Sequence, residues 1–179
     1  MLDTNGLGIV IVDMQDLCLV RLVEGKRRRI IGTLEGFLER VKELDLPTIA
    51  FQLADNHCNE HLNNPAYQTV PSIKERLPVG ASIFWKSLND GFTYYYEGSE
   101  QDKTPSDYFY RRGVSKVLVI GLFAEMCVYE TAKGAKANNF QVMFCDKLME
   151  ARNPGGLTTC EPFKRMGKYY QNYSELFND

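Results

Sequence analysis

The sequence predicts a three-layer α/β domain with a mainly parallel sheet, and we expect residues 1–179 to form that one domain. Apolar runs rich in β-branched residues alternate along the chain with segments of helical spacing, which is the order of βαβ units. The runs lack polar alternation, as is typical of strands buried on both faces of a parallel sheet. A chain of 179 residues that is 44% hydrophobic suits one core better than two.

The first half of the chain contains three predicted strands and one long helix. Residues 8–12 form a β-branched run that ends abruptly in charge. Residues 29–44 place apolar side chains three and four positions apart, as an amphipathic helix does, and a Leu-Pro pair closes the segment. Residues 48–53 and 81–85 are the next two strands, with a loop rich in Asn and Pro between them.

The second half continues the same alternation. A short helix is predicted between residues 104 and 113, because Thr and Pro start the segment and Gly follows its basic end. Residues 117–121 are the clearest buried strand of the chain. An Ala-rich helix at 127–138 and a further strand at 141–146 follow, so the βαβ order holds throughout.

Composition and charge narrow the class of partner. A formal net charge of -2 offers no general attraction to nucleic acid or to an anionic membrane, so we expect a small-molecule substrate. The one basic run, residues 26–29, precedes the long helical pattern and is interpreted as a solvated helix face without function.

Targeting signals and cysteine usage favour the cytoplasm. The N-terminus has neither the basic region nor the apolar stretch of a signal peptide, and no later run approaches membrane-spanning length. The odd number of cysteines and the absence of a C-x-x-C pair argue against a disulfide framework and against a zinc site made of Cys alone. Free thiols are therefore expected at Cys18, Cys58, Cys127, Cys145 and Cys160.

Three chemically active residues follow predicted strands. Ligands of open α/β sheets bind beyond the carboxyl ends of the strands, which is where Asp13, Lys86 and Cys127 lie in the prediction. Cys127 begins a predicted helix, whose dipole and free N–H groups favour the reactive thiolate. Each residue alone also fits an ordinary role: a turn, a lysine reaching solvent, a small core thiol. Together they are the base, cation and nucleophile that covalent catalysis needs.

Several segments resemble the isochorismatase-like cysteine hydrolases, a superfamily that includes nicotinamidases, ureido- and carbamoyl-hydrolases, and isochorismatase itself. The matching segments are residues 11–16, Lys86 after a strand, residues 119–132 and residues 142–146. The Gly-x-x-x-x-x-Cys-Val pattern followed by Thr-Ala is the most specific part. The resemblance covers most of the chain from Gly8 to Asp146.

The resemblance implies a Rossmann-like α/β/α fold and a catalytic set. Asp13, Lys86 and Cys127 take the roles of base, cation and nucleophile. A cis peptide bond is implied between Leu122 and Phe123, with the backbone N–H groups of Phe123 and Cys127 as oxyanion donors. The implied reaction is cleavage of a C–N bond in a small amide or ureide through a thioester. Isochorismatase proper lacks the nucleophilic cysteine, so Cys127 separates this chain from it.

The pattern Asp55-x-His57-x-x-x-His61 resembles the divalent-metal segment of nicotinamidases, and such ligands suit zinc, iron or manganese. Two departures weaken that assignment. No histidine lies between His61 and Lys86, and Cys18 stands where nicotinamidases usually carry Phe. A polar loop whose side chains cap a turn is the alternative reading of Asp55 and His57. A nicotinamidase and a catalytically silent binding module therefore stay open beside the amide or ureide hydrolase.

The tail after Asp146 and a group of aromatic residues are further candidates for the walls of the pocket or for a subunit interface. The tail after Asp146 departs from the family, which usually continues with another helix and strand, and the tail is expected to shape the pocket or a dimer contact. We expect a homo-oligomer. A dense aromatic group fits pocket walls, core or a subunit interface. Its members are Trp85, Phe92, Tyr94, Tyr95, Tyr96 and Tyr129.

Overall fold

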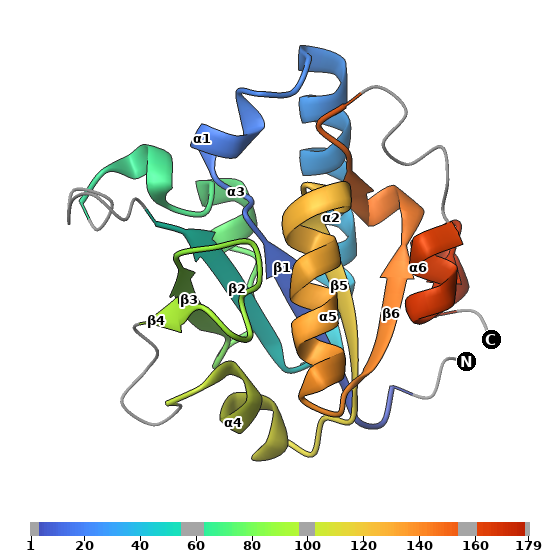
Figure 1. Cartoon of the computed structure of the whole chain (residues 1–179). Helices are drawn as coiled ribbons and strands as arrows, with labels where there is room; N and C mark the ends of the chain where they lie inside the picture. The colour runs from blue at the N-terminus through green and yellow to red at the C-terminus, as the bar shows by residue number, and fades with distance from the viewer. Residues whose placement is uncertain (1–3, 55–62, 97–102, 154–160, 178–179) are drawn as a thin grey trace.

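One eight-stranded sheet organises the part of the chain that the structure, a computed structural model, describes: residues 4–54, 63–96, 103–153 and 161–177 (Figure 1). The strand order is β4-β3-β2-β1-β5-β6-β8, and β7 pairs with β5. Every pairing is parallel except that of β3 with β4, so the predicted mainly parallel sheet is confirmed. The strands are β1 (Leu7–Val12), β2 (Thr48–Leu53), β3 (Ser82–Lys86), β4 (Tyr95–Tyr96), β5 (Lys116–Leu122), β6 (Gln141–Cys145), β7 (Met149–Glu150) and β8 (Lys168–Tyr170).

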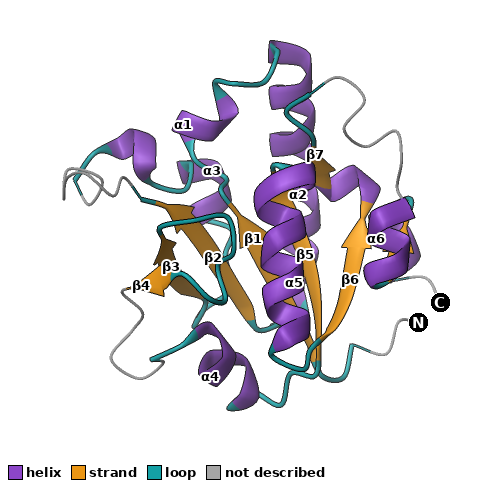
Figure 2. Cartoon of the chain, viewed as in Figure 1, coloured by secondary structure: helices purple, strands orange, loops and turns teal. Residues whose placement is uncertain are grey.

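Helices cover both faces of the sheet, which gives the predicted three layers (Figure 2). The long helix α2 packs on one face with α1 and α3, and α5 packs on the other face with α4 and α6. The α-helices are α1 (Asp16–Leu19), α2 (Glu24–Glu43), α3 (Pro71–Lys74), α4 (Pro105–Tyr110), α5 (Tyr129–Ala137) and α6 (Glu161–Met166). Shorter turns are η2 (Pro65–Tyr67), η3 (Ala124–Val128, a π-helical turn), η4 (Asp146–Leu148) and η5 (Tyr173–Leu176).

The central strand β1 shows why an unbroken apolar run was the correct signal. Successive side chains of a strand point to opposite faces of the sheet. Ile9 and Ile11 therefore pack into the core beneath α2, while Val10 and Val12 pack into the core beneath α5. All six residues of the strand are buried. A polar side chain at any of these positions would face a core rather than water.

The basic run of residues 26–29 lies inside α2, which begins five residues earlier than predicted, because Lys and Arg are good helix formers. The run does lie on a helix, and Arg28 and Arg29 are exposed as expected of a solvated face, but the run also makes contacts with a buried carboxylate. Lys26 Nζ lies 2.9 Å from Oε1 of the buried Glu150, and Arg29 pairs with the other carboxylate oxygen of the same residue. Glu150 stands opposite Leu122 in the β5–β7 pairing, so two of the four basic residues tie α2 to the sheet.

The tail after Asp146 does form another helix and strand, contrary to the sequence-based reading. Strand β8 pairs in parallel with β6 and extends the sheet by one strand. Tyr170 is buried, and the ring of Tyr173 packs edge-on against Phe37 of α2 at a centroid distance of 5.9 Å. Residues 170–177 of the tail therefore pack into the core on the α2 side, whereas Phe163 of α6 packs into the core on the α5 side.

Among the described residues, none of the helices combines the length and the apolar character that a membrane-spanning segment needs.

Candidate active site

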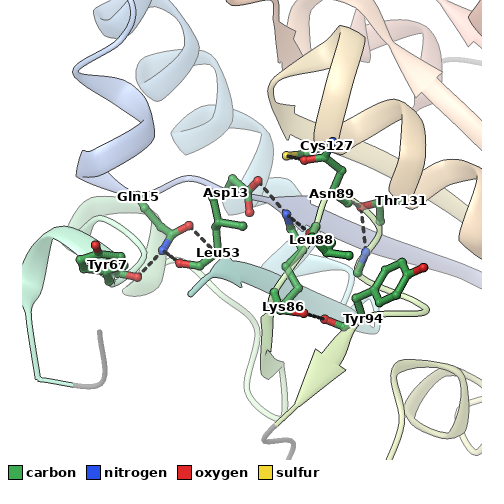
Figure 3. Close-up of polar contacts among 12 residues, drawn as sticks. Asp13, Gln15, Leu53, Tyr67, Lys86, Leu88, Asn89, Tyr94, Cys127 and Thr131 are labelled. Carbon is green, nitrogen blue, oxygen red and sulfur yellow. Dashed lines mark hydrogen bonds and ion pairs between the residues drawn. The ribbon is translucent and has the colours of Figure 1, made fainter. Parts of the chain in front are cut away.

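Asp13 and Lys86 form a buried ion pair at the carboxyl edge of the sheet (Figure 3). Asp13 follows β1 and Lys86 is the last residue of β3, with β2 between these two strands. Neighbouring strands lie about 4.8 Å apart, so only a long side chain can cross the width of β2. Lys86 Nζ lies 2.9 Å from Asp13 Oδ2, and the two side chains are 0% and 1% exposed. The ammonium also donates a hydrogen bond to the Leu88 carbonyl at 3.0 Å.

The backbone around Asp13 brings β1 and β5 together where the chemistry lies. Asp13 has a φ of 54°, a left-handed conformation that Asp tolerates better than most residues. Gly121 has a φ of 112°, and a Cβ there would lie 2.2 Å from the Val12 carbonyl oxygen. Glycine at 121 therefore allows β5 to approach β1 closely just before the chain turns toward Cys127.

Burial and charge act in opposite directions on the pair. Burial raises the pKa of Asp13, and the Lys86 ammonium and the Cys127 thiol lower it by less, so this carboxylate is a stronger base than an ordinary aspartate. Burial lowers the pKa of Lys86, but the Asp13 carboxylate, with a smaller contribution from Cys127, outweighs that effect and raises the pKa overall. Lys86 is therefore positively charged at neutral pH.

Cys127 lies in the π-helical turn η3 that precedes α5, next to this pair. Its side chain is 5% exposed, and Sγ donates a hydrogen bond to Asn89 Oδ1 at 3.4 Å. Burial, followed by the charge of Asp13, raises the pKa of Cys127 to about 12, although Lys86 acts to lower it. Burial and the Asp13 carboxylate therefore act against the thiolate that a helix start is expected to favour. The resting thiol is neutral.

The strand-to-helix turn before Cys127 has an unusual backbone. The Leu122–Phe123 peptide bond is cis, the isomer that the resemblance implies. The carbonyl of Phe123 then accepts hydrogen bonds from the N–H groups of Met126 and Val128 at 3.0 and 3.1 Å. Phe123 and Cys127 are thereby held at the two ends of one tight turn beside the thiol.

A loop that sequence reasoning missed completes this cluster. Thr131 of α5 is fully buried; its hydroxyl donates to the Asn89 carbonyl at 3.0 Å and accepts from the Gly91 N–H at 3.2 Å. A Cβ on Gly134 would lie 2.1 Å from Asp90 Oδ1, so the loop rests where α5 has no side chain. The available signal was Asn-Asp-Gly after a strand, which predicts a turn but not what the turn contacts.

Gln15 is a second residue whose role only the structure reveals. Its Oε1 accepts from the Leu53 N–H at 2.7 Å, while its Nε2 donates to the Leu53 carbonyl at 3.0 Å and also to the Tyr67 carbonyl. This buried side chain therefore ties together the two chain segments that flank residues 55–62.

The predicted metal ligands and the other cysteines are the remaining residues singled out from the sequence. Asp55 and His57 lie outside the described residues, as do Cys58, His61 and Cys160. Within the ranges that the structure covers, no group of three or more His, Cys, Asp or Glu side chains is positioned to hold a metal. Cys18 and Cys145 are buried free thiols, as expected for core cysteines.

The aromatic group is mostly core rather than pocket wall. Phe92 is 5% exposed and packs edge-on against Phe51 at 5.7 Å, while Trp85 is also buried. Tyr94 is 47% exposed. Tyr129 packs edge-on against Phe163 of α6 at 5.5 Å.

A cavity of about 550 Å³ lies elsewhere in the molecule, and neither Asp13, Lys86 nor Cys127 lines it. Its lining includes Lys116, Gln141 and Lys168, the first residues of β5, β6 and β8. It therefore opens at the amino edge of the sheet, opposite the edge that carries Asp13 and Cys127.

Solved structures of low sequence identity share this fold. An isochorismatase family protein from Burkholderia thailandensis is 15% identical with a TM-score of 0.78, covering 97% of this chain and 96% of its own. N-carbamoylsarcosine amidase from Thermoplasma acidophilum is 18% identical with a TM-score of 0.72, covering 92% and 95%. A pyrazinamidase of Pyrococcus horikoshii, solved in complex with zinc, is 20% identical with a TM-score of 0.70, covering 93% and 99%. These likenesses show the fold.

Sequence comparison identifies the family. No curated protein matches the chain closely enough to count as a relative. The family described as Isochorismatase domain matches residues 8–159, which is most of the 179-residue chain. The chain therefore belongs to the isochorismatase family of hydrolases.

Proposed function

We propose that this protein is a cysteine-dependent hydrolase that cleaves a C–N bond of a small amide or ureide through a thioester intermediate. The observation that carries the proposal is the cluster of Asp13, Lys86 and Cys127. A carboxylate with a raised pKa, a buried ammonium and a thiol meet at the edge of the sheet where ligands of α/β proteins bind. A purely structural role would not need a buried ion pair next to a thiol.

In the proposed first step, Asp13 accepts the Cys127 proton as the thiol approaches the substrate. The raised pKa of Asp13 favours this transfer, which the neutral resting thiol requires. Lys86 stabilises the negative charge that passes from the carboxylate to the sulfur. Proton transfer and attack are therefore coupled, and the free enzyme does not store a thiolate.

The second step is attack of the sulfur on the substrate carbonyl carbon. The carbonyl oxygen gains negative charge, and the backbone N–H groups of Phe123 and Cys127 are the proposed donors to it. Removing one such donor in other enzymes costs roughly 3 kcal/mol of transition-state stabilisation. Asp13 returns its proton to the leaving nitrogen as the C–N bond breaks, and a thioester with Cys127 remains. Water activated by Asp13 then hydrolyses that thioester.

The substrate class is proposed from the structural neighbours. Structural neighbours include a carbamoylsarcosine amidase and a pyrazinamidase, whose names describe C–N hydrolysis of small molecules. A metal-assisted nicotinamidase is the second candidate, favoured by the Asp-x-His pattern at Asp55 and His57 and by the zinc in the pyrazinamidase neighbour. Both residues lie outside the described part of the chain. The steps proposed for Asp13, Lys86 and Cys127 do not involve a metal.

An ammonia-release screen over amides, ureides and carbamoyl amines tests the proposal. Cys127→Ala should abolish release, whereas Cys145→Ala, which removes a buried thiol inside β6, should retain it. Release that survives in Cys127→Ala refutes the mechanism. Running the screen with and without a chelator separates the two candidates, since loss on chelation favours the metal-assisted branch.

A further inference from the structure

The loop from residue 87 to residue 94 holds one polar side chain against the thiol. Three hydrogen bonds close the loop on itself: the Ser87 N–H to the Tyr94 carbonyl at 2.9 Å, the Tyr94 N–H to the Asp90 carbonyl at 3.1 Å, and the Phe92 N–H to the Asp90 carboxylate at 2.9 Å. Thr131 then anchors the loop to α5 through the Asn89 carbonyl (Figure 3). The backbone of Asn89 is therefore fixed, while the residue remains exposed to solvent.

The carboxamide of Asn89 has one end in contact with Cys127. Oδ1 accepts a hydrogen bond from the Cys127 thiol at an Sγ···Oδ1 distance of 3.4 Å, and among the described residues Nδ2 has no hydrogen-bond partner. The other groups that act on the thiol are Asp13 after β1, whose carboxylate is a second acceptor for the thiol proton, Lys86 at the end of β3 and Cys18 in α1. Asn89 is thus the neutral polar group in a set that otherwise consists of charges and a second thiol.

Loss of the thiol proton changes the sulfur of Cys127 from a hydrogen-bond donor into an acceptor. A thiol donates a hydrogen bond, but a thiolate only accepts, so a carbonyl oxygen facing the thiolate would repel it. The two ends of a carboxamide are nearly equal in size. Half a turn of the amide group exchanges Oδ1 for Nδ2 without moving the loop that Thr131 anchors.

We propose that Asn89 is a catalytic residue that serves Cys127 in both protonation states: Oδ1 accepts from the thiol at rest, and Nδ2 donates to the thiolate after the proton has moved to Asp13. The S–H bond breaks, the carboxylate gains the proton, and no other bond changes. A hydrogen bond to the charged form stabilises that form. The inference rests on the proposed function for the role of Cys127, and it adds a residue that lowers the cost of forming the nucleophile.

The test is the rate at which iodoacetamide alkylates Cys127 in the intact chain, followed by peptide mass spectrometry at a fixed pH near 8. Asn89→Leu has nearly the shape of asparagine without its polar atoms, so access to the thiol is preserved. We expect alkylation to become about tenfold slower, the lower end of what a lost hydrogen bond to a charged group produces. Asn89→Asp should be slower still, because a carboxylate cannot donate and adds negative charge. The exposed Asn5, before the amino end of β1, provides the matched control Asn5→Leu, which should react like the original protein.

The sign of the change decides the question. If Asn89 only accepts from the neutral thiol, its removal frees the thiolate, and Asn89→Leu reacts as fast as the original protein or faster. That result overturns the proposal, as does an Asn89→Asp variant that reacts at the original rate. Because alkylation needs no substrate, these outcomes are independent of the ammonia-release screen. If the protein releases no ammonia in that screen but Asn89→Leu is alkylated more slowly as expected, the proposed hydrolase activity is refuted while the proposed contact between Asn89 and the thiolate is supported.

Discussion

Replacing Lys86 by methionine isolates the energetics of the buried pair. Both side chains are at most 1% exposed, and the N···O distance is 2.9 Å, so the variant leaves the Asp13 carboxylate buried without a counter-charge. Breaking such a pair by removing one partner typically costs about 3–5 kcal/mol. For a chain of this length, that loss corresponds to a fall in the unfolding midpoint of roughly 10 °C.

Urea unfolding followed by circular dichroism measures this loss, and its pH dependence tests the cause. With Lys86 absent, the pKa of Asp13 in the folded state lies still further above its unfolded value. The folded state then binds more protons than the unfolded state between these two pKa values, so the stability of Lys86→Met falls as the pH rises. The deficit relative to the original protein should be smaller near pH 5 than near pH 8.

The double variant Asp13→Asn with Lys86→Met supplies the control. It removes both charges, and asparagine tolerates the positive φ of residue 13, so most of the lost stability should return. Hydrolytic activity should stay absent, because neither base nor cation remains. If the free energy of unfolding of Lys86→Met lies within about 1 kcal/mol of that of the original protein, the reasoning is refuted, because a buried carboxylate without a counter-charge should destabilise the fold by more than that.

Three further predictions concern the surroundings of the pair. Thr131→Val should lower the free energy of unfolding by about 1–3 kcal/mol and reduce turnover, because the Asn89 carbonyl and the Gly91 N–H both lose a buried partner. Thr131→Ser keeps the hydroxyl and should behave like the original protein in unfolding and activity assays. Glu150→Gln should cost only about 1 kcal/mol in urea unfolding, because its partner Lys26 is one-third exposed and therefore screened; a loss that does not shrink in high salt would contradict this. Alkylation of Cys127 should accelerate about tenfold per pH unit from neutral to alkaline pH without a plateau, as a pKa of about 12 requires; a plateau near neutrality would show a stored thiolate.

The local sequence determined the elements and their order. The apolar run of β1 has no polar alternation, and both of its faces are buried, so the pattern predicted a strand of a parallel sheet correctly. The same reasoning placed Asp13 and Lys86 at strand ends and Cys127 in the turn that follows β5, because a residue that ends or follows a parallel strand lies at the carboxyl edge of the sheet. Element boundaries were less accurate: α2 begins at Glu24 rather than near residue 29, since helix propensity continues through the basic run.

The tertiary structure alone decided how these residues act on one another. Whether Lys86 meets Asp13 depends on the strand order β3-β2-β1, and no local pattern encodes the width of β2 between them. The neutral state of the Cys127 thiol follows from burial and from a carboxylate that is distant in sequence, whereas the local helix start predicted the opposite. The contacts of Asn89 and Glu150 likewise join segments dozens of residues apart. The sequence alone determined which reactive groups reach the edge of the sheet, because strand and turn propensities are local. Their protonation, pairing and support required the fold, because burial and electrostatic interactions depend on distances in space.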